Sequence, residues 1–508
     1  MKKKTVVIIG SGLTGLCAGA ILSMQGFQVV VLEANAECLG GHARSYCLDG
    51  QWICAGPQYV WGCGPGTIVA RVLDYLGLRD EVRFCPMDPD GFEDIWVGNS
   101  RRLAIPMGLS KFCQVMQVQF PGHQKGIETF FGLVESLCRV SCVLEDRGLY
   151  LEAGPARMMR VLGSLSLPLI DKIRLLQFHA CSLAELFDHC GLPPEARRVL
   201  YAHGGIFAEN ESSVSAVVYA AATGRYHAGA YFPVRGFKHL IDQLAAVIAG
   251  HGGSIHLGKR AAKLEVENRR IRRVVCDDRT RFEGDVVISN LSPRLTGLLL
   301  DGNLPEQYAY EPSNSLVGCF MTTKDYPEIH ERLNGRNIWW QDGAGEIEFN
   351  HPDMWAGPRM IYAGSPGDHG GDLRGGSKRA QSLAVFAPGN YEQARQAWLE
   401  GPEIHLKLKR RIQDGIINIL ESRVFPGIGG KISHAMVETP WDIHQKLGAE
   451  NGNVYGRRLS ADGVLHRAYP RLSLDHLHCG CATVGMPGVT TCFKTASIIT
   501  KKISGISI

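Results

Sequence analysis

The chain has almost no excess of charge of either sign. Its 508 residues include 54 lysines and arginines against 50 aspartates and glutamates, so the formal net charge is only +4. Binding to the phosphates of nucleic acid depends on clustered basic side chains, and no long basic stripe is present. We therefore expect no nucleic-acid partner.

Long apolar runs are also missing. The apolar stretch after the basic start MKKK is only five residues long before Gly10, whereas a helix needs roughly 18 apolar residues to cross a bilayer. The same stretch is too short for the apolar region of a secretory signal. We therefore expect a cytoplasmic protein, and leave peripheral contact with a membrane open.

The 16 cysteines follow no metal-binding pattern. Cys38, Cys47, Cys54 and Cys63 are spaced by nine, seven and nine residues, unlike the paired CxxC motifs of zinc and iron–sulfur sites. A chain of this length does not need disulfides for stability. We therefore expect mostly reduced thiols and no metal.

The composition favours a globular protein of two or three domains. Hydrophobic residues make up 45% of the chain and charged residues 20%, which is typical of folded proteins rather than disordered ones. The 60 glycines imply many tight turns or close backbone approaches.

The N-terminal segment carries a dinucleotide-binding fingerprint. The run TVVIIG predicts a buried strand, LCAGAILSMQG a helix, and QVVVLE a second strand. The turn GSGLTG, residues 10–15, joins the first strand to the helix. The residues expected to hold the nucleotide in this unit are Gly10, Gly12, Leu13, Thr14, Gly15, Glu33 and Ala34.

Each part of this fingerprint has a physical role. Gly10 allows a tight turn, Gly12 lets the backbone approach a pyrophosphate, and Gly15 lets the helix pack closely on the strand. The free N–H groups at the helix N-terminus attract the phosphates. Glu33 lies 18 residues beyond Gly15, where a carboxylate accepts hydrogen bonds from the ribose hydroxyls.

A second motif follows in EANAECLGGHARSY. It resembles the second FAD signature of the flavin amine oxidase and phytoene desaturase superfamily, in which a glycine pair and an arginine line the diphosphate and ribityl chain. The resemblance implies FAD as the cofactor. His42 stands where these families often carry arginine, and Arg44 is the expected substitute. The residues that the resemblance places beside FAD in this region are Gly40, Gly41, His42, Arg44, Gly56, Pro57 and Gln58.

Two further segments narrow the resemblance. Residues 229–292 are similar to the middle of the phytoene desaturase and retinol saturase-type flavoproteins. This similarity places Ala261 near the adenine and Asn290 at the end of a strand that returns to the cofactor. Residues 438–456, ETPWDIHQKLGAENGNVYG, resemble a segment that distinguishes this branch from the monoamine oxidases.

The stretch HCGCATVGMPGVTT, residues 478–491, resembles the last cofactor motif of the family. Cys481 replaces the usual polar residue after Gly480, and PGV begins the final helix. Because successive side chains of a strand face opposite sides, the histidines and cysteines here do not converge on a metal. The residues expected near the flavin are Gly480, Cys481, Met486, Gly488 and Val489.

The resemblance implies an α/β fold. A Rossmann-type FAD-binding domain (GR2-like) is interleaved with an α+β substrate domain, which has an antiparallel sheet and a helical lid. Periodicity predicts strands over 314–323, 337–341, 359–364 and 381–388, and one long helix from about Tyr391 to Glu421. The expected segments are 1–105, 228–312 and 436–508 for the FAD-binding domain, 106–227 for the lid, and 313–435 for the substrate-domain sheet and helix.

The implied activity is hydride exchange between flavin N5 and a substrate carbon. It desaturates or saturates a carbon–carbon bond of an apolar or conjugated small molecule, or isomerises a double bond. The catalytic residues are not assigned, and the candidates are Tyr59, Trp61, His203 and His444. A flavin amine oxidase and a divergent, non-catalytic FAD-binding or interaction protein are the alternatives. The sequence leaves open whether the protein forms a homodimer.

Overall fold

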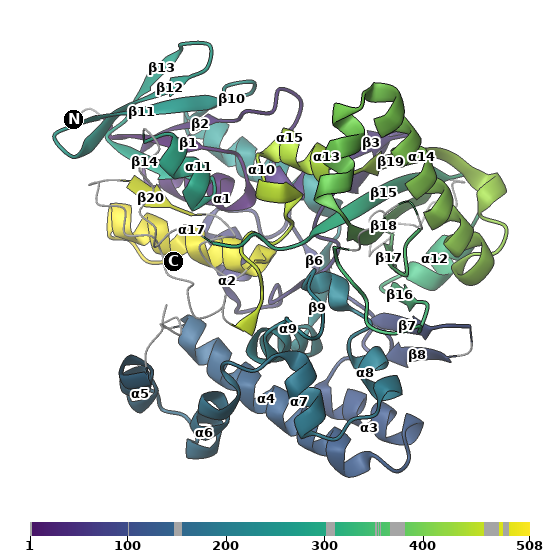
Figure 1. Ribbon diagram of the computed structural model, residues 1–508. Coiled ribbons are helices and arrows are strands. Elements are labelled where there is room, and N and C mark those ends of the chain that lie inside the picture. The colour runs from purple at the N-terminus through teal and green to yellow at the C-terminus, as the bar shows by residue number, and fades with distance from the viewer. Residues whose placement is uncertain are drawn as a thin grey trace.

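Two sheets and a helical layer form the framework of the protein (Figure 1). The computed structural model describes residues 3–99, 101–146, 155–300, 310–350, 353, 355, 357–365, 381–461, 477–480 and 487–508. One sheet is parallel and carries the predicted fingerprint, and the other is mostly antiparallel. The functional site lies between them.

The parallel sheet has five strands, and its central strand β1 is buried on both faces. Such burial explains the unbroken apolar run of that strand, since both faces are covered by other elements. The sheet takes strands from all three segments that the sequence assigned to the FAD-binding domain. Their order is β10 (Ser254–His256), β2 (Gln28–Leu32), β1 (Thr5–Ile9), β14 (Val286–Ser289) and β20 (Leu477–Cys479).

Helix α1 (Leu13–Met24) packs between this sheet and two other helices, α10 (Gly236–Gly250) and α17 (Val489–Ser504). It is apolar on every side, as expected for a helix that is covered all round. Gly19 allows the close packing, because a Cβ there would lie 2.9 Å from Ile248 Cδ1. The final helix, which the sequence predicted to begin at PGV, is confirmed as α17.

The larger sheet has seven strands, and all neighbours are antiparallel except β16 and β7. The four strands predicted between residues 314 and 388 all occur in it. Strands β7 and β8 also belong to this sheet, although they come from the segment expected in the FAD-binding domain. The order is β19 (Ile432–Glu438), β15 (Ser315–Thr323), β18 (Gln381–Gly389), β17 (Met360–Gly364), β16 (Asn337–Gln341), β7 (Glu93–Val97) and β8 (Arg101–Ile105).

The long helix predicted from Tyr391 to Glu421 is wrong, because the chain forms two helices there. Helix α13 (Tyr391–Leu399) ends before Gly401, whose φ is +128°, and α14 (Pro402–Ile419) begins at the next residue. Proline has no N–H to donate and is favoured in the first turn of a helix, so Pro402 starts a new helix. A π-helical turn, Leu420–Val424, follows α14.

The predicted helical region is confirmed as a layer of helices below the two sheets in Figure 1. The long helix α4 packs against α9, and α9 lies next to the cavity described below. The helices are α3 (Leu109–Gln119), α4 (Gln124–Asp146), α5 (Pro155–Gly163), α6 (Leu169–Phe178), α7 (Leu183–His189), α8 (Pro194–Leu200) and α9 (Ala216–Ala228).

Short elements connect these layers. Strand β9 pairs with both β5 and β6, and β3 pairs with β4. A small sheet of β11, β12 and β13 stands beside the parallel sheet (Figure 1). The bounds are β3 (Ser45–Leu48), β4 (Gln51–Cys54), β5 (Val60–Trp61), α2 (Ile68–Tyr75), β6 (Phe84–Pro86), β9 (Ala230–Pro233), β11 (Ala261–Glu267), β12 (Arg270–Cys276), β13 (Arg281–Glu283), α11 (Pro293–Leu298), α12 (Glu328–Leu333) and α15 (Pro440–Leu447).

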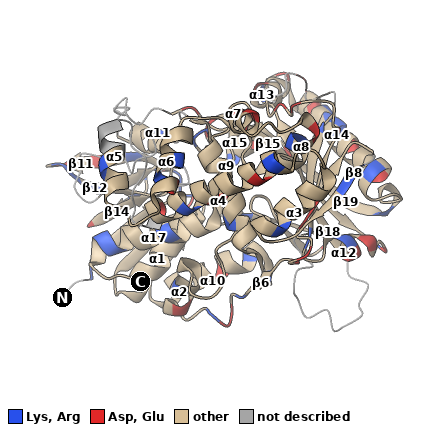
Figure 2. Ribbon diagram, turned by 90° about the horizontal axis from the view of Figure 1, so that it is seen from below, with Lys and Arg blue, Asp and Glu red and all other residues tan. Residues whose placement is uncertain are grey.

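Basic residues (blue) and acidic residues (red) are scattered along the ribbon in Figure 2. This distribution agrees with the small net charge of +4. In the part of the chain that the structure describes, no helix combines the length and the apolar character that crossing a bilayer requires.

Candidate active site

A cavity of about 600 Å³ extends from the parallel sheet to the large sheet. One end is formed by the chain segments that follow β1, β2 and β14. The other end is formed by α9, β16 and β17. Loops from residues 40–44, 55–61, 447–456 and 487–490 line it between these ends.

The end at the parallel sheet is a cradle of bare backbone. Gly10 has a φ of +91°, and a Cβ on Gly12 would lie 2.4 Å from Asn290 Nδ2. Gly12 also forms a β-bridge with Gly40, and a Cβ on Gly41 would lie 3.2 Å from the Gly12 Cα. Two glycine turns therefore meet at van der Waals distance, which leaves room for a ligand to approach the main chain.

The N-terminus of α1 opens into this cradle. Gly12 is its N-cap residue and supplies no side-chain cap, while Leu13 and Thr14 line the cavity. The first N–H groups of a helix have no partner within the helix and carry a partial positive charge. This arrangement attracts a phosphate group.

Glu33 lies directly after β2 and is 9% exposed, with its side chain at the cavity. Its carboxylate accepts hydrogen bonds from the backbone N–H groups of Ser11 and Asn35, both at 2.8 Å. These bonds fix the carboxylate beside the glycine turn, where it can accept hydrogen bonds from ribose hydroxyls.

Arg44 is held by protein groups rather than left free for a ligand. Its guanidinium forms a buried ion pair with Glu438, and both side chains are 2% exposed. It also donates to the Gly41 carbonyl at 3.2 Å and to the Tyr46 hydroxyl at 3.0 Å. Burial and the Glu438 carboxylate act in opposite directions on the guanidinium pKa, and the net shift is upward. Arg44 therefore stabilises the glycine pair.

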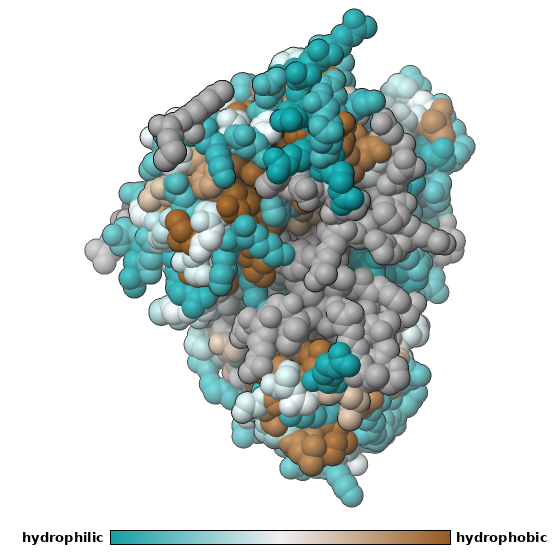
Figure 3. All heavy atoms as spheres, turned by 90° about the vertical axis from the view of Figure 1, so that its left-hand side faces the viewer, coloured by the Kyte–Doolittle hydropathy of each residue, from teal (hydrophilic) through white to brown (hydrophobic). Residues whose placement is uncertain are grey.

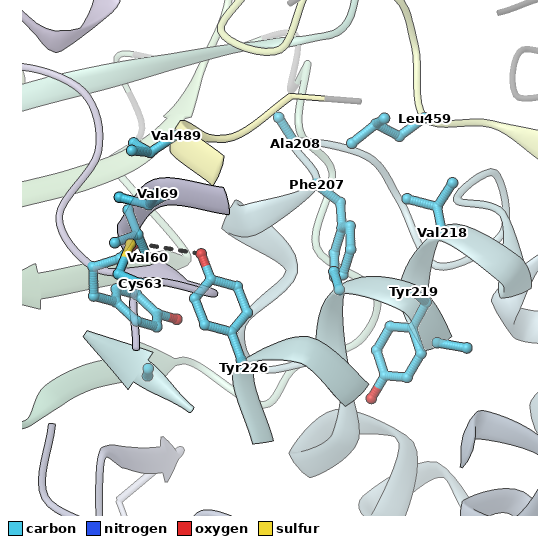
Figure 4. Close-up of a cluster of buried hydrophobic side chains, with 14 of the residues drawn as sticks. Val60, Cys63, Val69, Phe207, Ala208, Val218, Tyr219, Tyr226, Leu459 and Val489 are labelled. Carbon is cyan, nitrogen blue, oxygen red and sulfur yellow. Dashed lines mark hydrogen bonds between the residues drawn. The ribbon is translucent and has the colours of Figure 1, made fainter. Parts of the chain in front are cut away.

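The opposite end of the cavity is aromatic. Tyr59 stacks on Tyr362 with 6.3 Å between ring centroids, and Trp61 meets Tyr226 edge-on at 4.9 Å. Figure 4 shows Tyr226 pointing toward Val60 and Cys63, and its hydroxyl lies 3.4 Å from the Tyr59 carbonyl oxygen. Trp339, Phe207, Phe386 and Tyr455 complete this wall.

Tyr59 connects this wall to a buried carboxyl. Its hydroxyl donates to Glu93 Oε1 at 2.6 Å, and Glu93 is 3% exposed. Burial raises the pKa of Glu93 to about 7 and raises that of Tyr59 well above its usual value. The Tyr59–Glu93 pair therefore includes an acid that titrates close to neutral pH.

The two histidine candidates do not line the cavity. His203 is 4% exposed and lies behind the wall, where burial lowers its pKa to about 4. The Nδ1 atom of His444 lies 2.9 Å from the Ala449 carbonyl oxygen, and its ring stacks on Trp441. Tyr59 and Trp61, in contrast, both face the cavity.

Most of the predicted cofactor residues meet in this one cavity. Gly15 and Gly480 do not line it, because they are packing positions. A Cβ on Gly15 would lie 2.6 Å from the Gly10 carbonyl oxygen, and one on Gly480 would lie 2.5 Å from Ile499 Cδ1. Cys481 and Met486 lie outside the described residues. The predicted residues that line the cavity are Gly10, Gly12, Leu13, Thr14, Glu33, Ala34, Gly40, Gly41, His42, Arg44, Gly56, Pro57, Gln58, Ala261, Asn290, Gly488 and Val489.

Several lining residues were not anticipated from the sequence. Trp339 and Tyr362 lie on β16 and β17. The sequence predicted these two strands, but it gave no sign of which residues would lie beside them. Tyr455 belongs to the recognised segment 438–456, so its position could have been proposed. Glu93 gave no local signal, because only strand pairing brings it behind Tyr59.

These features fit FAD. The glycine cradle and the helix N-terminus suit the diphosphate, Glu33 suits a ribose, and the Lys259–Ala262 turn lies where the adenine is expected. Asn290 faces the same cradle. The aromatic end leaves space for an apolar ligand beyond the nucleotide cradle.

The chain matches the family of flavin-containing amine oxidoreductases over residues 13–324. The all-trans-retinol 13,14-reductase of Rattus norvegicus is 24% identical over 506 residues, covering 92% of this chain and 79% of that protein. The lycopene-forming phytoene desaturase of Pseudescherichia vulneris is 24% identical and covers 98% of this chain and 99% of its own. The chloroplastic prolycopene isomerase of Daucus carota is 22% identical, with 98% and 78% covered.

Solved structures agree on the fold. Putrescine oxidase bound to putrescine has a TM-score of 0.65 at 16% identity, covering 99% of this chain and 100% of that one. Cyclohexylamine oxidase from Brevibacterium oxydans has a TM-score of 0.60 at 14% identity, covering 99% and 100%. The family match and the sequence relatives indicate FAD as the cofactor, as the sequence implied.

We predict that Gly56→Ala weakens FAD binding. A Cβ at this position would lie 2.1 Å from the His42 carbonyl oxygen, so the loop carrying the glycine pair must move. We expect at least about a tenfold loss of affinity, which corresponds to roughly 1.4 kcal/mol. The measurement is flavin absorbance per protein after gel filtration and titration of the apoprotein with FAD. Gly250→Ala, where nothing lies within 4 Å of the new Cβ, is the control. Equal FAD retention in both variants would contradict this prediction.

We predict that Glu438→Gln destabilises the protein by about 3–5 kcal/mol, because it leaves the Arg44 guanidinium as an unpaired buried charge. Chemical denaturation of the purified holoenzyme measures the change. Glu283→Gln removes the partner of Arg273 in an ion pair whose Glu283 side chain is 76% exposed, and should change stability little. A small effect in both variants would show that the buried ion pair does not hold this region.

Proposed function

Because the chain belongs to the flavin-containing amine oxidoreductase family and is an FAD-dependent oxidoreductase, we propose that it acts on a carbon–carbon bond of an apolar, conjugated small molecule. The reaction is desaturation, saturation or isomerisation of a double bond. The observation that carries this proposal is the apolar, aromatic wall opposite the nucleotide cradle.

The distribution of charge within the cavity supports an apolar substrate. Along the described lining, the charged side chains lie on the nucleotide-binding segments, at the end of β19, on α15 and in the loop after α15. Lys446 pairs with Glu438, Lys259 pairs with Asp278, and Glu450 accepts from Ser292 and Tyr310. The described wall formed by α9, β16 and β17 contributes only apolar and neutral aromatic side chains.

The protein's own contribution is binding, orientation and exclusion of water. Bound FAD supplies the group that exchanges hydride with the substrate carbon. The aromatic faces of Tyr59, Tyr226 and Tyr362 offer large apolar area to a conjugated chain. A dry wall also prevents side reactions of a reactive carbon centre with water.

Amine oxidation is the second candidate. The stacked pair Tyr59 and Tyr362 could hold a cationic amine through cation–π attraction, and the structural neighbours include amine oxidases. Against this reading, the two lysines on the described lining, Lys259 and Lys446, are engaged by acidic partners. The relatives that match by sequence act instead on retinol and carotenoids.

Anaerobic half-reactions separate the two candidates. We expect phytoene to bleach the oxidised flavin, or all-trans-retinol or lycopene to reoxidise the flavin after dithionite reduction. Isomerisation causes no net bleaching of the flavin. It is therefore measured by chromatography of a poly-cis carotene after incubation with the protein. Putrescine and cyclohexylamine should leave the flavin spectrum unchanged. Bleaching by the amines, with no response to any polyene, would overturn the proposal in favour of an amine oxidase.

We also infer peripheral contact with anionic membranes through the outer face of α6. This face carries three exposed apolar side chains: Leu169 (72% exposed), Ile170 (51%) and Ile173 (48%). Met159 of the neighbouring helix α5 is 55% exposed. Apolar surface is visible at the lower end of Figure 3, where α5 and α6 lie. Lys172 is next to this face, and such apolar and basic faces favour anionic lipid surfaces. The proposed location is the cytoplasm, with reduced thiols and transient contact with membranes that store apolar substrates.

Vesicle binding tests this inference. The triple variant Leu169→Ser, Ile170→Ser, Ile173→Ser should lose most co-sedimentation with vesicles that contain phosphatidylglycerol, because it removes the exposed apolar side chains. Leu399→Ser changes a leucine that is 59% exposed on α13 and serves as the control. Equal binding by the triple variant and the control would contradict a role for α6.

A further inference from the structure

Tyr59 is a cavity-lining residue whose hydroxyl is hydrogen-bonded to a buried acid, Glu93. We propose that Tyr59 and Glu93 form a proton relay, in which Tyr59 exchanges a proton with the substrate and Glu93 stores it. This inference rests on the proposed function, because desaturation or saturation of a carbon–carbon bond moves a proton in addition to a hydride. Tyr59 would be the catalytic residue, and Glu93 would act through it.

The geometry suits such a relay. Tyr59 is 6% exposed and faces the cavity, and its hydroxyl donates to Glu93 Oε1 at 2.6 Å. Glu93 is 3% exposed and does not itself line the cavity. The Tyr59 hydroxyl is therefore the polar group through which a proton on the carboxyl can reach a ligand.

The surroundings isolate this pair from charge. His203 Nδ1 lies 4.0 Å from Glu93 Oε2, beyond hydrogen-bond distance, and has no hydrogen-bond partner in the described part of the chain. The titratable groups that face Glu93 from the neighbouring elements are Tyr59, Tyr219, Tyr226, Tyr362 and His203, and His227 lies behind His203.

Only one member of this group changes charge near neutral pH. Burial raises the pKa values of Tyr59, Tyr226 and Tyr362 well above 10, and it lowers those of His203 to about 4 and His227 to about 3. Burial also raises the pKa of Glu93 to about 7. Glu93 can therefore both accept and give a proton at physiological pH, which suits a general acid–base.

The proton balance follows from this arrangement. In desaturation, hydride leaves one substrate carbon for the cofactor, and the electron pair of the adjacent C–H bond becomes the new double bond. The proton from that C–H bond goes to the Tyr59 oxygen, while the Tyr59 proton moves to the Glu93 carboxylate. In saturation each transfer runs in reverse, and the protonated Glu93 resupplies Tyr59. Proton exchange with solvent later resets Glu93.

Kinetics of two variants test the relay. Tyr59→Phe and Glu93→Gln should each lower kcat by about 10²-fold or more, the usual range for a lost acid–base group. Both should keep FAD content near the wild-type level, because neither residue lies in the nucleotide cradle. The wild-type kcat should depend on pH with an apparent pKa near 7. For desaturation kcat should be higher at pH values above this pKa, and for saturation it should be higher at pH values below it. Glu93→Gln should abolish this dependence.

Tyr362→Phe provides the matched comparison. Tyr362 also lines the aromatic wall, but its hydroxyl donates to the neutral Asn337 side chain at 2.6 Å. We expect this variant to change KM while it keeps the pH dependence of kcat. If Tyr362→Phe removes the pH dependence, or Glu93→Gln leaves it in place, the relay is overturned.

A thermal readout needs no substrate. The pKa of Glu93 is raised in the folded state, from 4.5 to about 7. The folded protein therefore holds more protons, and stability falls as pH rises through this window. The Tm of the wild-type holoenzyme, relative to that of Glu93→Gln, should thus fall by at least about 1 °C between pH 5 and pH 8. A constant Tm difference would overturn the role of Glu93. If the wild type turns over no polyene but the Tm difference changes, the proposed function fails while the titration of Glu93 stands.

Discussion

The buried ion pair between Arg44 and Glu438 is the contact on which the cavity depends. Arg44 follows the second glycine turn, and Glu438 ends β19 of the large sheet, so this pair ties the glycine-pair loop to the large sheet. Arg44 also donates to the Gly41 carbonyl, which keeps the glycine pair against Gly12. These bonds hold the guanidinium in place, so Arg44 positions the backbone of the glycine pair. Removing the Glu438 carboxylate would leave the Arg44 guanidinium as a buried charge without its acidic partner.

The cavity has two halves that differ in their chemistry. The half at the parallel sheet offers bare backbone, a helix N-terminus and the Glu33 carboxylate, all suited to a dinucleotide. The half at the large sheet offers stacked aromatic rings and few polar atoms. A shared fold by itself does not fix the substrate, so the substrate has to be argued from the aromatic half of the cavity.

The pairing of β7 with β16 explains how an acid enters the aromatic half. Strand β7 comes from the N-terminal part of the chain, yet it joins the large sheet in parallel with β16 and places Glu93 opposite Asn337. Tyr362 on β17 donates to Asn337, and Tyr59 donates to Glu93. Tyr59 is thus joined to a carboxyl and Tyr362 to an amide, although the two rings stack on each other. Two residues of one type therefore have different acid–base roles, set by their partners.

The sequence by itself determined the βαβ unit at residues 5–33, the cofactor segments, the helical region and the strands of the second sheet. These follow from local signals: glycines at fixed spacing, runs buried on both faces, and alternation along a strand. It misjudged the helix over 391–421, and it could not identify Glu93, Trp339 or Tyr362 as neighbours of Tyr59. Only the tertiary structure decided those contacts, because strand order within a sheet and the burial of a carboxyl depend on segments hundreds of residues apart. A local pattern shows that a strand is apolar, whereas its partner strand and its distance from the cavity are properties of the whole fold.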